Sequence, residues 1–331
     1  MRSIIVVTPI KNESWILRRF LAVCSSFADM IVVADQHSTD NSREICREFG
    51  KVRLVDNASD QYDEASRQRL LLETARRIVP GERFILALDA DEILTADSRG
   101  AASWRVVHSA APGTVFYYEK ADIGSPPSRC RRSNTYFPLG YIDDGSTHKG
   151  DIIHSTRVPL RDASPREEIH DIKFAHLAYV RSEEFWARQR LYSLVERLKR
   201  TKTLRQRLGY YSPRLQRALI QAQMSQTPLT WLMPWRNCGI DFESFATSDL
   251  NNYNREILGM MDKYGAEPFF YDDIWDVDWE DLRQRFSATG QSVYPQFRSP
   301  ITRPGLRFRA VTSALVWLIW LRRHLPAIRR P

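Results

Sequence analysis

The sequence lacks closely spaced cysteines and a glycine-rich phosphate-binding loop, and each absence excludes a class of protein. No Gly-x-Gly-x-x-Gly follows a predicted strand, which excludes the dinucleotide-binding fold of dehydrogenases. No signal peptide is expected, because the sequence leads directly into an apolar run at residues 4–7 that reads as a strand. The four cysteines show no metal-finger spacing and fit a reducing cytoplasm; they are Cys24, Cys46, Cys130 and Cys238.

Composition indicates a globular, basic chain. Apolar residues make up 43% of the 331 residues and charged residues 27%, which is enough for one large core or two modest ones. Lysine and arginine together exceed the acids by eight. This excess predicts contact with an anionic partner, and charge alone leaves open a phosphate, a membrane surface or a nucleic acid.

Apolar runs and amphipathic stretches alternate over the first 120 residues, which is typical of β-α-β units. Strands are predicted at Ser3–Thr8, Met30–Ala34, Val52–Val55, Arg83–Leu88 and Thr114–Glu119, with another at Ile172–Val180. Helices are predicted between the first strands at Ser14–Phe27, Ser42–Phe49 and Asp63–Val79. Because parallel strands bind ligands beyond their carboxyl ends, the polar loops after these strands should share one sheet edge.

Two carboxylates, Asp89 and Asp91, directly follow the apolar run Arg83–Leu88. Such closely spaced acids repel one another at the end of a buried strand, so they are tolerated best where a divalent cation lies between them. The pair therefore predicts a metal–diphosphate site. A solvated turn after the strand is the alternative for an Asp-x-Asp considered alone.

Two other loops bring polar groups to the same predicted edge. Thr8 to Glu13 follow the first strand and can bind a base and ribose. Asp35 ends the second strand, where its carboxylate can accept hydrogen bonds from a base or from ribose hydroxyls. Asp40, later in the same loop, is expected to cap the following helix.

These three segments resemble the family 2 glycosyltransferases, which have the GT-A fold. The resemblance covers roughly the first 120 residues and lies, in order, in Val6–Glu13 (VVTPIKNE), Asp35–Ser42 (DQHSTDNS) and Leu88–Glu92 (LDADE). The second segment departs from the family pattern, because Asp-Gln-His stands where two acids and a glycine are usual.

The resemblance implies a role for each matching residue. Asp35 would hold the base of a nucleotide-diphospho-sugar, and Asp89 would contact the ribose or the metal. Asp91 would ligate Mg²⁺ or Mn²⁺, a hard ion that suits oxygen ligands and neutralises the departing diphosphate. The residues implied to border the nucleotide are Pro9, Asn12 and Glu13. Arg67 and Arg69 lie where the family places a basic residue near the donor phosphates, although helical geometry disfavours both pointing inward.

An inverting transfer, which most family 2 enzymes perform, requires a carboxylate that takes the acceptor's proton. We favour Asp143 and Asp144, which follow an apolar-aromatic stretch in a region where an acceptor loop is expected. The remaining acids that could serve are Asp151, Glu167, Glu168 and Asp171.

Four of the seven histidines cluster at positions 148, 154, 170 and 176. The resemblance implies that His176 reaches the metal or the diphosphate. A buried core imidazole is the alternative for this residue.

Beyond residue 180 the sequence is predominantly helical. Helices are predicted at Glu183–Gln206, Pro213–Gln226 and Phe245–Tyr264. Near the end, Ala310–Leu321 are uncharged and have arginines on both sides. As a helix this stretch spans about 18 Å, short of the ~30 Å core of a bilayer. The amphipathic segment 305–325 therefore predicts an interfacial membrane anchor, with docking on the protein or on a second subunit as the alternative.

The sequence thus predicts an α/β domain of the GT-A type over residues 1–180, with a doubly wound, mostly parallel sheet. Its nucleotide half would end near residue 120, and an acceptor and metal half would follow. A helical extension is expected over 181–331. The predicted activity is metal-dependent, inverting transfer of a sugar from a nucleotide-diphospho-sugar to a glycan or lipid-linked acceptor. We expect it on the cytoplasmic face of a membrane, in cell-envelope polysaccharide or glycolipid synthesis.

Two other functions are left as alternatives. A sugar-nucleotide nucleotidyltransferase would also use a doubly wound domain and a metal, but Thr8–Glu13 has no glycine. A non-catalytic basic protein could bind nucleic acid through arginine-rich helices such as Arg188–Arg207.

Overall fold

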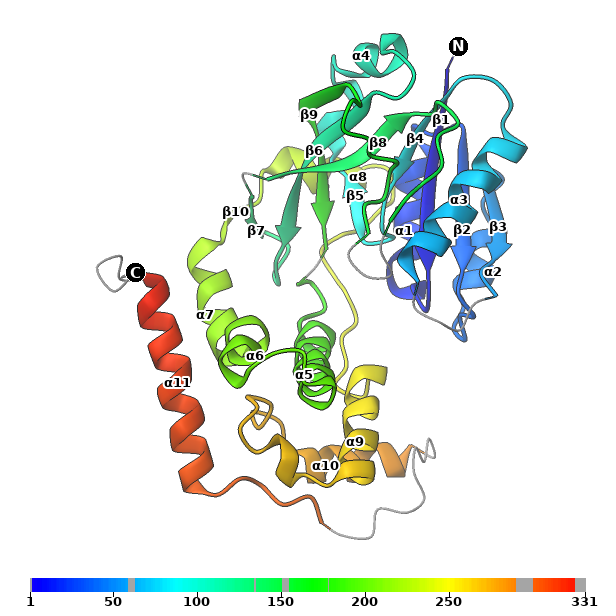
Figure 1. The fold of residues 1–331 in the computed structure, drawn as a ribbon. Coiled ribbons are helices and arrows are strands. Elements are labelled where there is room, and N and C mark those ends of the chain that lie inside the picture. Colours follow the sequence, from blue (N-terminus) through cyan, green and yellow to red (C-terminus); the bar gives the residue numbers. More distant parts are fainter. Residues whose placement is uncertain are drawn as a thin grey trace. The chain divides into compact units, whose positions relative to one another are not determined.

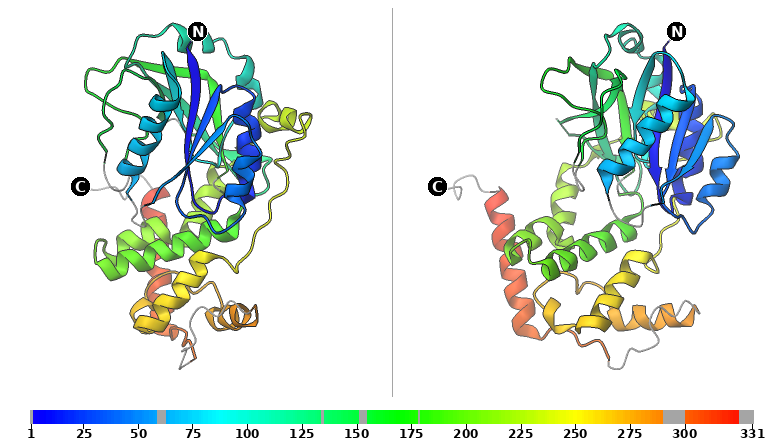
Figure 2. Two further views of the ribbon diagram at one scale, coloured as in Figure 1. Left: turned by 90° about the vertical axis from the view of Figure 1, so that its right-hand side faces the viewer. Right: turned by 45° about the vertical axis from the view of Figure 1, so that its right-hand side comes forward.

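The computed structural model describes residues 2–58, 63–133, 135–150, 155–177, 179–289 and 300–324. The chain divides into two compact units, shown in Figures 1 and 2. Residues 1–180 and 225–245 form the first, and residues 181–224 and 246–331 form the second. The predicted helical extension over 181–331 is therefore interrupted, because residues 225–245 return to the first unit.

Four parallel strands form the amino-terminal half of the first unit's sheet, in the order β4-β1-β2-β3. They span Ser3–Ile10 (β1), Met30–Asp35 (β2), Val52–Asp56 (β3) and Arg83–Ala87 (β4). The helices between them are α1 (Ser14–Ser25), α2 (Ser42–Arg47) and α3 (Glu64–Ile78). These are the predicted elements, and their order confirms that the polar loops after β1, β2 and β4 share one edge.

The other strands of the first unit pair mostly antiparallel. They are β5 (Glu92–Leu94), β6 (Val115–Ile123), β7 (Arg129–Arg131), β8 (Tyr136–Ile142), β9 (Arg166–His176) and β10 (Ser225–Gln226). β8 joins them to β4 by antiparallel pairing, and β9 runs parallel to β6. A short 3₁₀ helix, η1 (Ala96–Gly100), and α4 (Trp104–Ser109) precede β6. The sheet is thus mixed, with its parallel part at the predicted nucleotide half, and the predicted α/β fold is confirmed.

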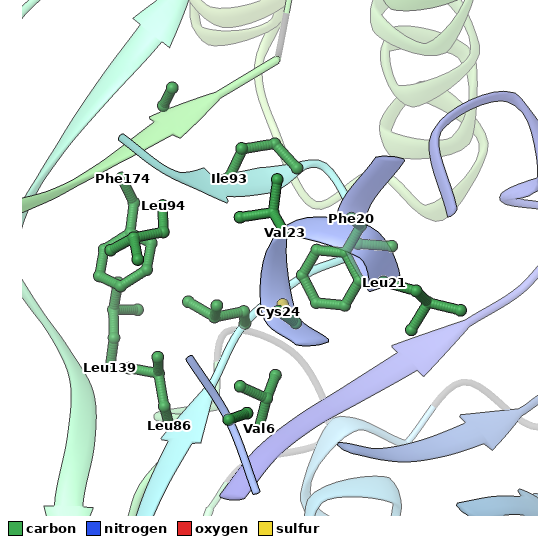
Figure 3. Packing of buried hydrophobic residues seen from close by; sticks show 14 of the residues in the cluster. Val6, Phe20, Leu21, Val23, Cys24, Leu86, Ile93, Leu94, Leu139 and Phe174 are labelled. Atoms are coloured by element: carbon green, nitrogen blue, oxygen red, sulfur yellow. The ribbon is translucent and has the colours of Figure 1, made fainter. Parts of the chain in front are cut away.

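Alternation along the strands gives the sheet two apolar faces, which α1 and α3 cover from opposite sides (Figure 1). Val6 and Leu86 pack with Phe20 and Leu21 of α1 on one face, as Figure 3 shows. Cys24 lies in the same cluster, and burial raises the pKa of its thiol. Cys24 therefore serves as a core residue.

Residues 225–245 belong to the first unit because their aromatic side chains complete its core. β10 adds a short strand to β7, and α8 (Leu229–Arg236) follows it. Trp231 and Trp235 of α8 are buried in the larger core cluster, and the indole N–H of Trp235 donates to the carbonyl of Leu94 at 2.9 Å. A buried tryptophan needs such a partner for its N–H.

The second unit is helical over its described residues. It contains α5 (Ser182–Lys199), α6 (Leu204–Tyr211), α7 (Pro213–Gln223), α9 (Asn252–Tyr264), η2 (Glu267–Phe269), α10 (Trp279–Ala288) and α11 (Leu306–His324). The predicted single helix 183–206 ends instead at Arg200, which adopts a left-handed conformation. A capping box formed by Thr203 and Gln206 then starts α6. No helix within the described ranges is both long enough and apolar enough to span a membrane.

Candidate active site

The loops after β1 and β2 are joined by hydrogen bonds. The backbone N–H of Asn12 donates to Ser38 Oγ at 2.8 Å, and Asn12 Oδ1 accepts from the N–H of Thr39 at 2.7 Å. Asp40 accepts from the N–H groups of Ser14 and Ser42, each at 3.0 Å, so one carboxylate serves the first turns of both α1 and α2. The N-cap position of α2 is Asn41 rather than the predicted Asp40, but Asp40 binds the first N–H of that helix, and the two loops form one wall.

Several residues predicted to border a nucleotide lie at this wall. Asp35 pairs with Ile10 in the sheet register, at the carboxyl ends of β2 and β1. Its buried carboxylate accepts from Arg43 at 2.6 Å and from the N–H of Ser38 at 3.2 Å. Glu13 accepts from the indole of Trp15 at 2.8 Å. Thr8 is fully buried in β1. The structure therefore brings Asp35 and Glu13 to the predicted edge, whereas Thr8 pairs with Val33 inside the sheet.

Three acids gather after β4, where the sequence predicted two. Glu92 is buried and accepts from the N–H of Asp89 at 3.0 Å and from Lys120 Nζ at 2.8 Å. Arg157 donates one nitrogen to Glu92 and the other to Asp89. Although burial alone would raise it, the charges of Arg157 and Lys120 hold the pKa of Glu92 well below its usual range. Glu92, Lys120 and Arg157 were not predicted as site residues.

Asp91 lies beside His176, as the metal prediction requires. His176 Nε2 is 3.5 Å from Asp91 Oδ2, and His176 Nδ1 is 2.7 Å from Asp122 Oδ1. The strand register produces this arrangement, because His176 of β9 pairs with Glu92 of β5 on one side and Asp122 of β6 on the other. Burial lowers the pKa of His176, but Asp91 and Asp122 outweigh it and raise that pKa to about 10.

The Asp91–His176 pair has the spacing for a divalent ion, which would bind only after displacing the Nε2 proton that the raised pKa keeps on the imidazole at neutral pH. Bonds of roughly 2.1 Å place neighbouring ligands of Mg²⁺ about 3 Å apart, close to the separation of these two atoms. Asp122 can fix the imidazole by accepting from Nδ1–H, as carboxylates do behind metal-bound histidines. No three His, Cys, Asp or Glu side chains converge as a metal site in the part of the chain that the structure describes. Two protein ligands suffice for Mg²⁺ where phosphates and water complete its shell.

A cavity of about 280 Å³ opens at the same edge. Pro9, Asp89, Arg157 and Arg67 are among its lining residues. Arg69 is not, and its guanidinium donates instead to Ser66 Oγ at 2.6 Å. This outcome agrees with the expectation that helix geometry turns only one of the two arginines inward.

Asp143 and Asp144 do not lie at this edge. Because β8 is antiparallel to β4, its last residue pairs with Phe84, and the N–H of Asp143 donates to the carbonyl of Arg83, the first residue of β4. The Asp143 carboxylate is bound by Arg76 at 2.9 Å and Arg83 at 2.8 Å. Asp144 pairs with Arg161. The topology therefore corrects the prediction that this pair supplies the base.

The other predicted acids and histidines have separate partners. Glu168, near the start of β9, pairs with Arg166, and Asp171 accepts from the N–H of Ser103 at 3.1 Å. His148 lies 3.2 Å from Ser155 Oγ, and His170 lies 2.7 Å from the hydroxyl of Tyr136. Glu167 shares the start of β9, whereas Asp151 and His154 lie outside the described residues. Of the histidines described, His176 alone joins the acids after β4.

Comparison with protein families supports the resemblance found in the motifs. The model described as Glycosyl transferase family 2 matches residues 5–99, a segment that contains the loops after β1, β2 and β4. The predicted resemblance is confirmed over this segment. No curated protein matches the sequence.

Solved structures show more distant similarity. TarS 1–349 from S. aureus in complex with UDP is 13% identical, with 100% of this chain and 93% of that chain covered and a TM-score of 0.40. A second structure is glucosyl-3-phosphoglycerate synthase from Mycobacterium tuberculosis in complex with Mn²⁺, UDP and glucosyl-3-phosphoglycerate. It is 17% identical, with 38% of this chain and 45% of that chain covered and a TM-score of 0.27. A 4-diphosphocytidyl-2C-methyl-D-erythritol synthase is 16% identical, with 43% of this chain and 73% of that chain covered and a TM-score of 0.29. At these values the likenesses carry no conclusion about chemistry.

Proposed function

We propose that this chain, whose residues 5–99 match glycosyl transferase family 2, transfers a sugar from a nucleotide-diphospho-sugar to an acceptor hydroxyl. The observation that carries the proposal is the convergence of Asp91 and His176 beside a cavity lined by Pro9, Arg67 and Asp89. A nucleotide-diphospho-sugar and its divalent ion need carboxylate, imidazole and guanidinium groups close together at the donor site. The nucleotide half would end near residue 120 and the acceptor half near residue 180.

In this proposal each group at the edge has a separate task. A Mg²⁺ or Mn²⁺ ion held by Asp91 and His176 would supply the positive charge that makes the nucleoside diphosphate a good leaving group. Asp122 orients His176 by accepting from Nδ1–H. Arg67, on the cavity wall, adds a cation for the phosphates, and Asp35 accepts hydrogen bonds from the base. Transfer is proposed to invert the anomeric centre, as the family resemblance implies.

The acceptor is proposed to be a glycan or a lipid-linked sugar of the cell envelope, used at the cytoplasmic face of a membrane. Residues 282–331 carry ten arginines and no acid, whereas the whole chain has a net charge of +8. One face of α11 packs on α6 and α7 through Ile319 and Leu315. The large apolar residues of α11 that are exposed are Leu306, Val311, Trp317, Leu318 and Trp320. Exposed tryptophans among arginines favour an anionic lipid surface.

Sedimentation with lipid vesicles tests the membrane proposal. The wild type should bind phosphatidylcholine vesicles that contain phosphatidylglycerol, and Trp317→Ala with Trp320→Ala should weaken this binding, because two interfacial anchors are lost. Tyr264→Ala removes an equally exposed aromatic from α9 and serves as the control. Equal binding by all three proteins would refute the proposal.

The nucleic-acid alternative is weakened because two of the arginines that suggested it are buried and paired. Arg190 and Arg207 have side chains only 3% exposed, and they pair with Asp276 and Asp272. Buried guanidinium groups cannot form the exposed basic stripe that binds phosphates along a nucleic acid.

Calorimetry with UDP, GDP and CDP, each with and without Mn²⁺, tests the donor site. The wild type should bind one of them in a Mn²⁺-dependent manner, and Asp91→Ala should abolish the dependence. Glu168→Gln removes an exposed acid near the start of β9, at the other end of the strand from His176, and should bind like the wild type. Failure of folded wild-type protein to bind any diphosphate would overturn the proposal. Binding of a nucleoside triphosphate with pyrophosphate release would favour the nucleotidyltransferase alternative.

A further inference from the structure

Arg157 occupies the place between the acids where positive charge is needed. Its guanidinium bridges Asp89 and Glu92, and it also lines the cavity at the sheet edge. Arg157 lies on the segment before β9, far from both acids in the sequence. Although distant in the sequence, Arg157 forms ion pairs inside the predicted ligand site, and this arrangement suggests a function for it.

The two partners of Arg157 differ in their exposure. The Glu92 side chain is fully buried, and Lys120 and the N–H of Asp89 hold it in place. The Asp89 side chain is 41% exposed and borders the cavity. A buried carboxylate holds its cation strongly, because separating them would leave an uncompensated charge. An exposed pair is worth far less, since water and incoming ligands compete with it.

We infer that Arg157 exchanges Asp89 for the donor's diphosphate when the divalent ion binds. The inference rests on the proposed function and names a regulation of the same site. Glu92 keeps one side of the guanidinium fixed, while the other side turns from the Asp89 carboxylate to a phosphate oxygen. Both acceptors are anionic oxygens that a guanidinium binds well. Asp89 is thereby released to the ion or to the ribose.

This exchange couples the two ligands. In the absence of nucleotide, Arg157 opposes the ion, because its positive charge lies beside Asp89 and near Asp91. With nucleotide bound, the phosphates draw Arg157 away and add their own oxygens. The ion and the nucleoside diphosphate should therefore each strengthen the binding of the other by the same factor, as linkage requires. We expect the exchange of Arg157 between Asp89 and the phosphates to couple the two ligands by about tenfold or more.

Mn²⁺ titrations monitored by electron paramagnetic resonance and calorimetry test the inference on the full chain. The probe is Mn²⁺ alone, and then Mn²⁺ with the nucleoside diphosphate that the wild type binds among UDP, GDP and CDP. The wild type should bind Mn²⁺ at least about tenfold more tightly when the nucleotide is present. Arg157→Met should bind Mn²⁺ alone about tenfold more tightly than the wild type. Nucleotide should then strengthen Mn²⁺ binding by a smaller factor than in the wild type, because only the phosphate oxygens still contribute.

Two further variants separate the inference from general damage. Arg157→Lys keeps a positive charge without the forked geometry, so it should retain the weak binding of Mn²⁺ alone and lose part of the coupling. Arg161→Met removes an exposed arginine of the same segment and should behave like the wild type. Circular dichroism establishes that each variant is folded.

The outcomes distinguish this inference from the proposed function. If the wild type binds nucleotide with Mn²⁺ and Arg157→Met shows the same coupling, the role of Arg157 is refuted while the donor site stands. If the wild type binds no nucleotide under any condition, the proposed function and this inference both fail. Coupling reduced in Arg157→Met and kept in Arg161→Met supports the inference.

Discussion

Each unit of this chain contains an aspartate paired with an arginine from a distant segment, and the two pairs are built differently. In the second unit, Asp272 and Arg207 are 0% and 3% exposed, and Ser193 adds a hydrogen bond to the carboxylate at 2.9 Å. In the first unit, Asp89 and Arg157 are 41% and 26% exposed beside a cavity. The buried pair ties α6 to the segment before α10, whereas the half-exposed pair can exchange partners with a ligand.

The largest expected effect breaks the buried pair. Asp272→Ala should lower the free energy of unfolding by about 3–5 kcal/mol, because it leaves Arg207 buried without its carboxylate. Asp89→Ala should lower it by less, since its pair is half-buried and partly screened by water. Urea denaturation of both variants measures the difference. Similar losses in the two variants would remove the distinction between the pairs.

The next effect concerns the hydrogen bond between Asp122 and His176, one of the two proposed metal ligands. Asp122→Asn should weaken Mn²⁺ binding in the presence of nucleotide by about 10- to 100-fold, because the imidazole of His176 loses the carboxylate that orients it. Asp97→Asn, on η1, provides a control acid away from His176. Calorimetry measures the affinity, and an unchanged value in Asp122→Asn would show that His176 needs no such support.

A pH dependence sharpens the comparison at the opposite sheet edge. Burial alone would raise the pKa of Asp143, but Arg76 and Arg83 hold it below its usual range. The folded state therefore binds this proton less readily than the unfolded state. The stabilisation is present above the unfolded pKa, near 3.9, and is lost as the pH falls through the folded pKa. Asp143→Asn should lose less stability than the wild type between neutral pH and about pH 3, as measured by urea denaturation.

The smallest effect concerns the wall formed by the first two loops. Asp40→Ala should cost about 1 kcal/mol of stability, the usual loss for a helix cap, since two N–H groups lose their acceptor. Asp40→Asn keeps an acceptor oxygen and should recover most of the loss. Thermal denaturation compares the two variants, and equal melting temperatures would contradict this role of Asp40.

The parallel half of the fold could be predicted because its signals are local. Each strand from β1 to β4 is a short apolar run followed by polar residues, and the order of parallel strands puts those residues at one edge. Asp89 and Asp91 were recognisable for this reason. Asp40 could be placed at the start of a helix because it stands just before a helical pattern.

The antiparallel half could not be predicted in the same way, because its geometry depends on register between distant strands. Asp143 follows an apolar strand just as Asp89 does, but β8 runs the opposite way and carries it to the other edge. Asp122 and His176 meet only through the pairing of β6 with β9. Arg157 precedes β9 in a segment without a repeating pattern, so no local signal connects it with Asp89 and Glu92. Residues 225–245 return to the first unit through packing of tryptophans that a helix pattern alone does not reveal.

The most direct test of the account is pulsed electron paramagnetic resonance of Mn²⁺ bound to the full chain with its nucleoside diphosphate. The account predicts a nitrogen coupling from one imidazole together with a phosphorus coupling from the diphosphate. His176→Asn should lose the nitrogen signal. Phosphorus coupling without nitrogen in the wild type would contradict the metal role of His176, and the absence of both from folded protein would contradict the donor site itself.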